Sequence, residues 1–179
     1  NAGLACMFTM MNHARLGVGL QGQGVSELAC QASIAYANDR LQGRSLSGAK
    51  FPDKPADPLI VHPDIRRMLL TCKSLAEGGR MLALHAATLV DVLERSKDEN
   101  ERKEADVLLG FLTPIVKGLL TEWGNECTYH AMQCFGGHGY VREWGMEQLA
   151  RDARITTIYE GTTGIQALDL LGRKTMQLQ

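Results

Sequence analysis

Four of the five prolines in this 179-residue sequence lie in a single short stretch, between Gly43 and Pro63. Proline lacks a backbone N–H and breaks helices, and the same stretch is rich in glycine, serine, aspartate and lysine, so we predict an extended loop there. Regular structure must therefore form on either side of this loop. Residues 10–41 contain no proline, are mostly apolar or small, and predict one long helix, although glycines weaken its first half.

The segments after the loop also follow a helical pattern. Residues 62–95 have a proline, Pro63, near their start and repeat apolar side chains at spacings of three, four and seven, which predicts a helix with one buried stripe. Residues 97–104 are charged and predict a solvated turn, and residues 107–132 predict a third long helix in which Pro114 is tolerated by a kink. Shorter helices are expected over residues 146–152 and 163–175.

The alternation of β-branched residues that marks strands is nearly absent from the sequence. We therefore predict an all-α fold, an up-down helical bundle of three to four long helices plus short C-terminal helices. The length suits one domain, residues 1–179. Because the chain starts at Asn1 without a methionine, we expect it to be an excised domain.

Composition narrows the classes of function. The chain is 45% apolar with a formal net charge of -1, so no overall positive field indicates binding to nucleic acid or to an anionic membrane. No segment reaches the roughly 18 consecutive apolar residues that span a bilayer. Five cysteines without a CxxC spacing favour reduced thiols and a cytoplasmic location, and neither the cysteines nor the histidines show a metal-ligand spacing.

A glycine motif with GxGxxG spacing lies at residues 17–22. That spacing binds a dinucleotide where a strand turns into a helix, but no strand-like run precedes it in this sequence. We therefore interpret these glycines as small residues that allow two helices to pack closely.

Two further blocks allow both a structural and a functional interpretation. Residues 133–140, with glycines at 136, 137 and 139, form either a helix C-cap or a turn whose exposed N–H groups let a phosphate or a flavin edge approach. Glu160 is either a solvated carboxylate near a helix N-terminus or a general base. The second role is favoured because apolar residues precede Glu160 and Gly161 follows it, which would direct the carboxylate into a partly dry pocket.

Two arginines have ordinary interpretations when they are taken alone. Arg15, one turn after Asn12, fits a solvated polar turn at the start of the first long helix. Arg40 fits a cation that complements the carbonyl groups at the end of the same helix.

Taken together, residues 133–140, the sequence Arg151-Asp152-Ala153-Arg154 and residues 158–166 resemble the C-terminal domain of the acyl-CoA dehydrogenases. The similarity covers essentially the whole chain. The long loop resembles that of the larger bacterial members, including those that act on 3-methylthiopropanoyl-CoA. The resemblance implies that an N-terminal helical domain and a middle β domain are absent from this chain, and that the isolated domain is inactive.

The resemblance also implies an activity and roles for particular residues. The enzyme would be an oxidoreductase that converts an acyl-CoA thioester to the 2,3-enoyl-CoA, with Glu160 removing the α-proton and hydride passing to N5 of FAD. Some members carry the base at the position of Ala14, which cannot accept a proton. Substrate contacts are implied for Asn12, Arg15 and Gly161. Cofactor contacts, several of them across a dimer, are implied for Arg40, Gln133, Cys134, Phe135, Gly136, Gly137 and Thr162.

The implied partners are the acyl-CoA substrate, an electron-transfer flavoprotein, and further copies of the subunit in a homodimer or homotetramer. Two other functions stay open at this stage. One is an acyl-CoA oxidase of the same superfamily, which hydrogen peroxide production by the full-length protein would distinguish. The other is a non-catalytic helical domain that serves assembly or binding.

Overall fold

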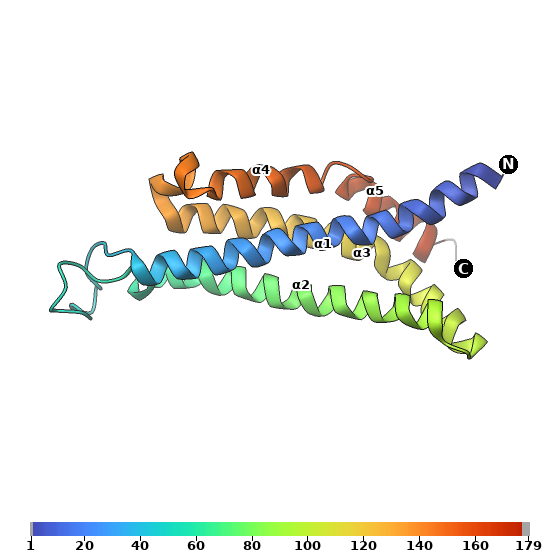
Figure 1. The fold of residues 1–179 in the computed structure, drawn as a ribbon, viewed down its shortest axis with the longest axis horizontal. Coiled ribbons are helices and arrows are strands. Elements are labelled where there is room, and N and C mark those ends of the chain that lie inside the picture. Colours follow the sequence, from blue (N-terminus) through green and yellow to red (C-terminus); the bar gives the residue numbers. More distant parts are fainter. Residues whose placement is uncertain (1, 177–179) are drawn as a thin grey trace.

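The computed structural model of this chain describes residues 2–176. Its three long helices are α1 (Ala2–Asp39), α2 (Pro63–Arg95) and α3 (Glu99–Phe135), and the shorter helices α4 (Met146–Thr156) and α5 (Thr163–Leu168) follow. Each of the first four helices runs opposite to the one before it, and α4 lies along α3 (Figure 1). Within residues 2–176 the β structure is limited to an isolated bridge between Leu41 and Pro58. The predicted all-α up-down bundle is confirmed.

The helix boundaries differ most from the predicted ones at the starts of α1 and α3. Helix α1 begins at Ala2, well before residue 10, and α3 begins at Glu99 instead of residue 107. The prediction of a solvated turn over residues 97–104 was therefore wrong for most of that segment. The Asp98 side chain accepts a hydrogen bond from the N–H of Asn100 at 2.8 Å, and acidic residues in the first turn suit the positive end of the helix dipole.

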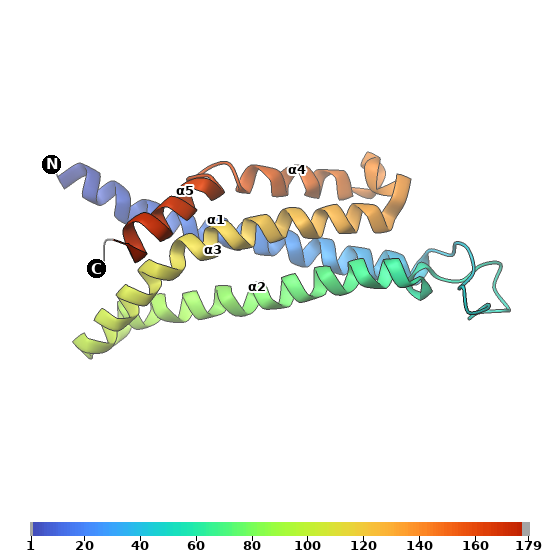
Figure 2. The same ribbon diagram turned by 180° about the vertical axis from the view of Figure 1, so that it is seen from behind.

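Pro114 lies inside α3, as predicted. Figure 2 shows that α3 changes direction in its yellow first half, the part of the helix that contains this proline. Proline removes one hydrogen bond of the helix ladder and crowds the preceding turn, which accounts for a bend there.

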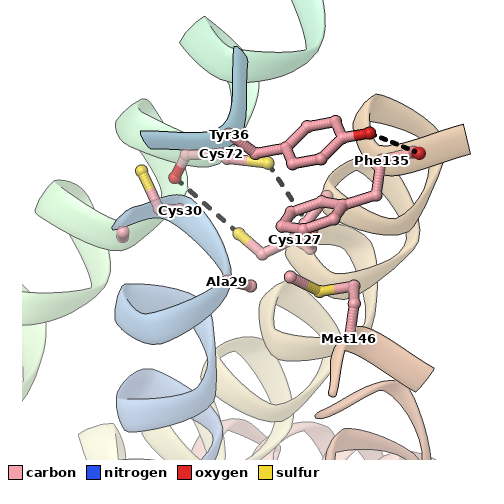
Figure 3. Packing of buried hydrophobic residues seen from close by; sticks show 9 residues of the cluster. Ala29, Cys30, Tyr36, Cys72, Cys127, Phe135 and Met146 are labelled. Atoms are coloured by element: carbon pink, nitrogen blue, oxygen red, sulfur yellow. Dashed lines mark hydrogen bonds between the residues drawn. The ribbon is translucent and has the colours of Figure 1, made fainter. Parts of the chain in front are cut away.

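The largest core cluster joins α1, α2, α3 and the start of α4, and includes Tyr36, Cys72, Cys127, Phe135 and Met146 (Figure 3). The Cys72 thiol donates to the carbonyl of Cys127 at 3.5 Å, and the Cys127 thiol donates to the carbonyl of Cys72 at 3.7 Å. These reciprocal bonds tie α2 to α3 at the centre of the bundle. All five cysteines are free thiols.

The GxGxxG glycines bring α1 and α3 together. A Cβ atom added at Gly22 would lie 2.6 Å from the carbonyl oxygen of Leu120, and one added at Gly19 would lie 2.9 Å from a methyl group of Val116. Gly17, on another side of α1, is exposed and has open space around it. Close packing between helices, and not dinucleotide binding, therefore accounts for the motif.

The loop between α1 and α2, which includes the short 3-10 helix η1 (Leu59–Val61), is organised around the buried carboxylate of Asp57. This carboxylate accepts N–H bonds from Ser45, Lys50 and Phe51 at 2.9, 3.0 and 2.8 Å. The Arg44 guanidinium lies 3.4 Å away. The backbone N–H bonds, with that of Ser45 foremost, hold the pKa of Asp57 at about 2. The proline-rich segment is thus a loop, as predicted, but one with a fixed interior.

One segment, Glu99–Tyr140, is long and apolar enough to cross a membrane by length and composition alone. Half of its most apolar window is buried inside the bundle, and the core helix of a soluble protein passes the same test.

Candidate active site

The turn between α4 and α5 carries Glu160 in an unusual backbone conformation. Glu160 has φ 55°, and among residues 2–176 it is the one non-glycine residue with positive φ. The next residue, Gly161, has φ 89°. The left-handed region is energetically unfavourable for a residue that has a Cβ atom, and such strain concentrates at functional sites. The sequence supports the turn locally, because the Thr162 side chain caps α5 by accepting the N–H of Ile165.

The two carbonyl groups of this turn are held from both sides by buried side chains. Lys117 on α3 donates from Nζ to the carbonyl of Gly161 at 2.7 Å. Gln166 on α5 donates from Nε2 to the carbonyls of Glu160 and Gly161, both at 3.2 Å. A Cβ atom at Gly161 would lie 2.7 Å from that same nitrogen. The positive φ favours glycine at position 161, and a larger residue there would also displace the Gln166 amide from the turn.

Buried charges surround the turn. Lys117 is fully buried, and burial followed by the nearby Arg15 charge lowers its pKa, against the opposing influence of Glu122 and Glu160. Arg15 on α1 is itself buried and forms an ion pair with Asp169 at 3.0 Å. The interpretation of Arg15 as a solvated residue was therefore wrong, and its partner lies 154 positions away in the sequence.

Two polar atoms beside the turn lack a hydrogen-bond partner within the described part of the chain. They are Nε of Arg15 and Oε1 of Gln166, and both are buried. A buried donor and a buried acceptor without partners are costly, and a polar ligand or an ordered water is the usual partner at such a place. Asn12, one turn before Arg15 on α1, is exposed and lines a groove of about 310 Å³.

The remaining predicted site residues lie far from Glu160. Arg40 directly follows α1, and helix geometry places it roughly 37 Å along the bundle from Arg15. Gln133 in the last turn of α3 and Gly136 and Gly137 just after it are exposed, and a Cβ atom at either glycine would meet nothing within 4 Å. The backbone of this turn is therefore open to a ligand. Figure 1 shows this end of α3 beside the start of α4.

Cys134 and Phe135, which belong to the same predicted group, turn their side chains into the bundle. Burial raises the pKa of the Cys134 thiol to about 11, and the thiol packs in a cluster with Ala37 and Met68. The Phe135 ring stacks on Tyr36 with 4.1 Å between ring centroids. Only the backbone atoms of these two residues are placed to touch a ligand outside the bundle.

The glycine turn after α3 forms the 3-10 helix η2 (Gly136–Tyr140). A cluster of aromatic side chains, which the sequence analysis did not predict, supports this turn. The Tyr36 hydroxyl lies 2.8 Å from Nδ1 of His138, and the His138 ring stacks on Trp144 with centroids 4.8 Å apart. Rings from α1, α3 and the following segment thus brace the turn. Within residues 2–176, no group of three or more His, Cys, Asp or Glu side chains could hold a metal ion.

Comparison with known proteins shows which proteins this chain is similar to. It is 47% identical over 177 residues to 3-methylmercaptopropionyl-CoA dehydrogenase of Ruegeria pomeroyi, covering 99% of this chain and 29% of that protein. It is 31% identical over 172 residues to the CarC subunit of the caffeyl-CoA reductase–Etf complex of Acetobacterium woodii, covering 96% of this chain and 39% of that one.

The fold of this chain is also similar to that of a solved structure. The structure of butyryl-CoA dehydrogenase from Megasphaera elsdenii matches with a TM-score of 0.75 at 26% identity, over 96% of this chain and 38% of that one. The chain therefore spans less than half the length of each of these proteins. Residues 1–174 match the family described as acyl-CoA dehydrogenase, C-terminal domain. The chain belongs to the acyl-CoA dehydrogenase family, and it corresponds to the C-terminal domain of that family.

Proposed function

We propose that this chain is the C-terminal domain of an FAD-dependent acyl-CoA dehydrogenase that oxidises an acyl-CoA thioester to the 2,3-enoyl-CoA, with Glu160 as the base. The observation that carries the proposal is the strained turn at Glu160, whose carbonyls are fixed by Lys117 and Gln166. A base that must meet one particular C–H bond gains from such fixing, because proton transfer depends on the distance between heavy atoms.

In the proposed reaction the substrate loses a proton from Cα and a hydride from Cβ, and a carbon–carbon double bond forms between these atoms. The carboxylate of Glu160 takes the proton. When bound, FAD supplies the acceptor for the hydride. In this family the base lies at one of two positions, which correspond to Ala14 and Glu160 in this chain. Ala14 has no group that accepts a proton, so we assign the base to Glu160.

The open glycine turn and the exposed Arg40 suit a phosphate-bearing cofactor, because backbone N–H groups and a guanidinium both bind phosphate oxygens. Gln133, Gly136 and Gly137 would hold the adenosine-diphosphate part of FAD, and Thr162 would lie beside the flavin. Arg15, which would contact the substrate, and Arg40 lie roughly 37 Å apart along the bundle. The glycine turn and Arg40 would therefore hold the cofactor of a neighbouring subunit, whereas Glu160 and Thr162 would face the flavin of their own site, which requires at least a homodimer.

Electrons would leave the enzyme through an electron-transfer flavoprotein. This part of the proposal is supported by the relative that is a subunit of a reductase–Etf complex. An oxidase would pass electrons to oxygen instead. Hydrogen peroxide production by the full-length protein distinguishes the two acceptors.

The test is the variant Glu160→Gln in the full-length protein that contains this chain. General-base catalysis contributes roughly 10²–10⁴-fold in rate, so kcat for acyl-CoA oxidation should fall by at least about 100-fold. Flavin content and acyl-CoA binding should stay near the wild-type values, because the amide keeps the volume of the side chain. The matched control is Glu126→Gln, which neutralises an exposed carboxylate on α3 and should leave kcat unchanged.

Two results would contradict the proposal. Near-normal turnover by Glu160→Gln would move the base to another residue. A wild-type protein that oxidises no acyl-CoA, with or without added FAD, would favour a non-catalytic assembly domain.

A further inference from the structure

We infer that Lys117 is a positioning residue for Glu160, a buried cation on α3 that holds the turn and steers the carboxylate. This inference rests on the proposed function, because it assigns a role toward the proposed base. It concerns a residue that the sequence analysis did not single out.

The setting of Lys117 is unfavourable for stability alone. Its side chain is fully buried, although lysine is almost never fully buried unless it is paired. Within residues 2–176 it forms no ion pair within 4.0 Å, and its hydrogen bond goes to a neutral carbonyl, that of Gly161. Removing an ammonium group from water costs more than one such bond returns. The fold therefore carries an energetic cost at this position.

The hydrogen bond of Lys117 indicates a role in the turn that carries Glu160. The carbonyl that Lys117 holds belongs to the peptide unit that joins Gly161 to Thr162, one unit after the peptide that joins Glu160 to Gly161. Glu160 and Gly161 both have positive φ, so the direction of the Glu160 side chain depends on how the peptide units of this turn are held. Lys117 fixes the second carbonyl from α3, while Gln166 fixes both from α5.

The charge of Lys117 also acts on Glu160 directly. The charged groups around Lys117 are Arg15 on α1, Glu122 on α3 and Glu160 in the turn. The Arg15 charge is matched by Asp169 at 3.0 Å. The Glu122 carboxylate accepts the Thr163 hydroxyl at 2.6 Å. Attraction to the Lys117 charge favours an inward direction for the Glu160 carboxylate.

The experiment replaces Lys117 with methionine in the full-length holoenzyme. Methionine keeps most of the length of the side chain and removes the charge and the donor, while Gln166 still serves the Gly161 carbonyl. We expect kcat to fall by about tenfold or more with KM for acyl-CoA within about threefold, since the loss concerns a step after binding. The kinetic isotope effect for α-deuterated acyl-CoA should increase, because proton removal becomes slower relative to the other steps.

The thermal stability of Lys117→Met should not fall together with its kcat. Replacing a buried unpaired charge by an apolar side chain of similar size is often neutral or stabilising. The thermal midpoint of Lys117→Met should therefore equal or exceed that of the wild type, with flavin content unchanged. Loss of a residue that only supports the fold should instead lower the thermal midpoint together with kcat.

Two further variants keep the test decisive. Gln166→Met removes the other donor to the turn and should show the same fall in kcat with unchanged KM. Thr128→Val is the matched control, because Thr128 is buried on the same helix and bonds only within it, and it should leave kcat and the isotope effect unchanged.

The outcomes separate this inference from the proposed function. If Glu160→Gln abolishes turnover while Lys117→Met keeps wild-type kcat and isotope effect, the positioning role is overturned and the proposed function stands. If kcat falls only in proportion to lost flavin or lost folded protein, the positioning role is again overturned. If Glu160→Gln retains turnover, the proposed function itself fails.

Discussion

The close approach of α1 and α3 at Gly22 predicts a large effect of one methyl group. A Cβ atom there would lie 2.6 Å from the carbonyl oxygen of Leu120 and 2.8 Å from Cα of Thr121, and neither backbone atom can rotate away. Gly22→Ala therefore forces the helices apart. Overpacking of this kind costs about 1–3 kcal/mol, and we take the upper end because both contacts are with backbone. Alanine regains about 1 kcal/mol of helix propensity, so the net loss is roughly 2 kcal/mol.

The matched control is Gly17→Ala on the same helix. A Cβ atom at Gly17 meets nothing within 4 Å, so only the gain in helix propensity remains, about 0.5–1 kcal/mol. For a chain of this size each kcal/mol shifts the thermal midpoint by roughly 2–4 °C. By circular dichroism we expect the midpoint of the 179-residue chain to fall by about 4–8 °C for Gly22→Ala and to rise slightly for Gly17→Ala. Equal midpoints for the two variants would refute the close α1–α3 contact.

Two further predictions concern the loop and the cofactor. The pKa of Asp57 is lowered from 3.8 to about 2, so its stabilising effect on the loop is fully present above pH 4 and is lost as the pH falls toward 2. Pepsin cleavage within residues 43–57 should accelerate over that range in the wild type, whereas Asp57→Asn should be cleaved quickly throughout; identical pH profiles would count against the role of Asp57. In the full-length enzyme, Arg40→Ala should weaken FAD retention by about tenfold or more, measured as flavin released on gel filtration, because a cation available to the phosphates is lost. Unchanged flavin content would indicate that the FAD phosphates bind at residues other than Arg40.

Periodicity and proline placement predicted the helices well, since both reflect local chemistry. Helix α2 begins and ends where its apolar spacing and His62-Pro63 indicate. The start of α3 was missed because the charges of residues 99–104 suggested a turn, although an exposed first turn accepts them readily. The polarity of a segment predicts its exposure more reliably than its backbone conformation.

The buried polar network around Glu160 could not be predicted in the same way. Lys117 stands in the apolar run Pro114–Leu120, and a lysine in the apolar stripe of a core helix was the one available signal. Nothing local links Arg15 to Asp169, because an ion pair between distant positions depends on how the helices pack. The positions of Glu160 and Gly161 in a turn before a helix were predicted, but their backbone strain was not.

The stacking of Trp144 on His138 gives the glycine turn a built-in optical probe. The chain has two tryptophans, and Trp144, 47% exposed, lies at the end of the bundle that carries Gly136 and Gly137, whereas Trp123 packs in a separate cluster about 18 Å along α3 from Phe135. Indole emission overlaps flavin absorption, so a flavin arriving at this turn would quench Trp144 by resonance energy transfer more strongly than Trp123. Cofactor arrival would then be followed in real time without a dye, with Trp123 as the internal reference.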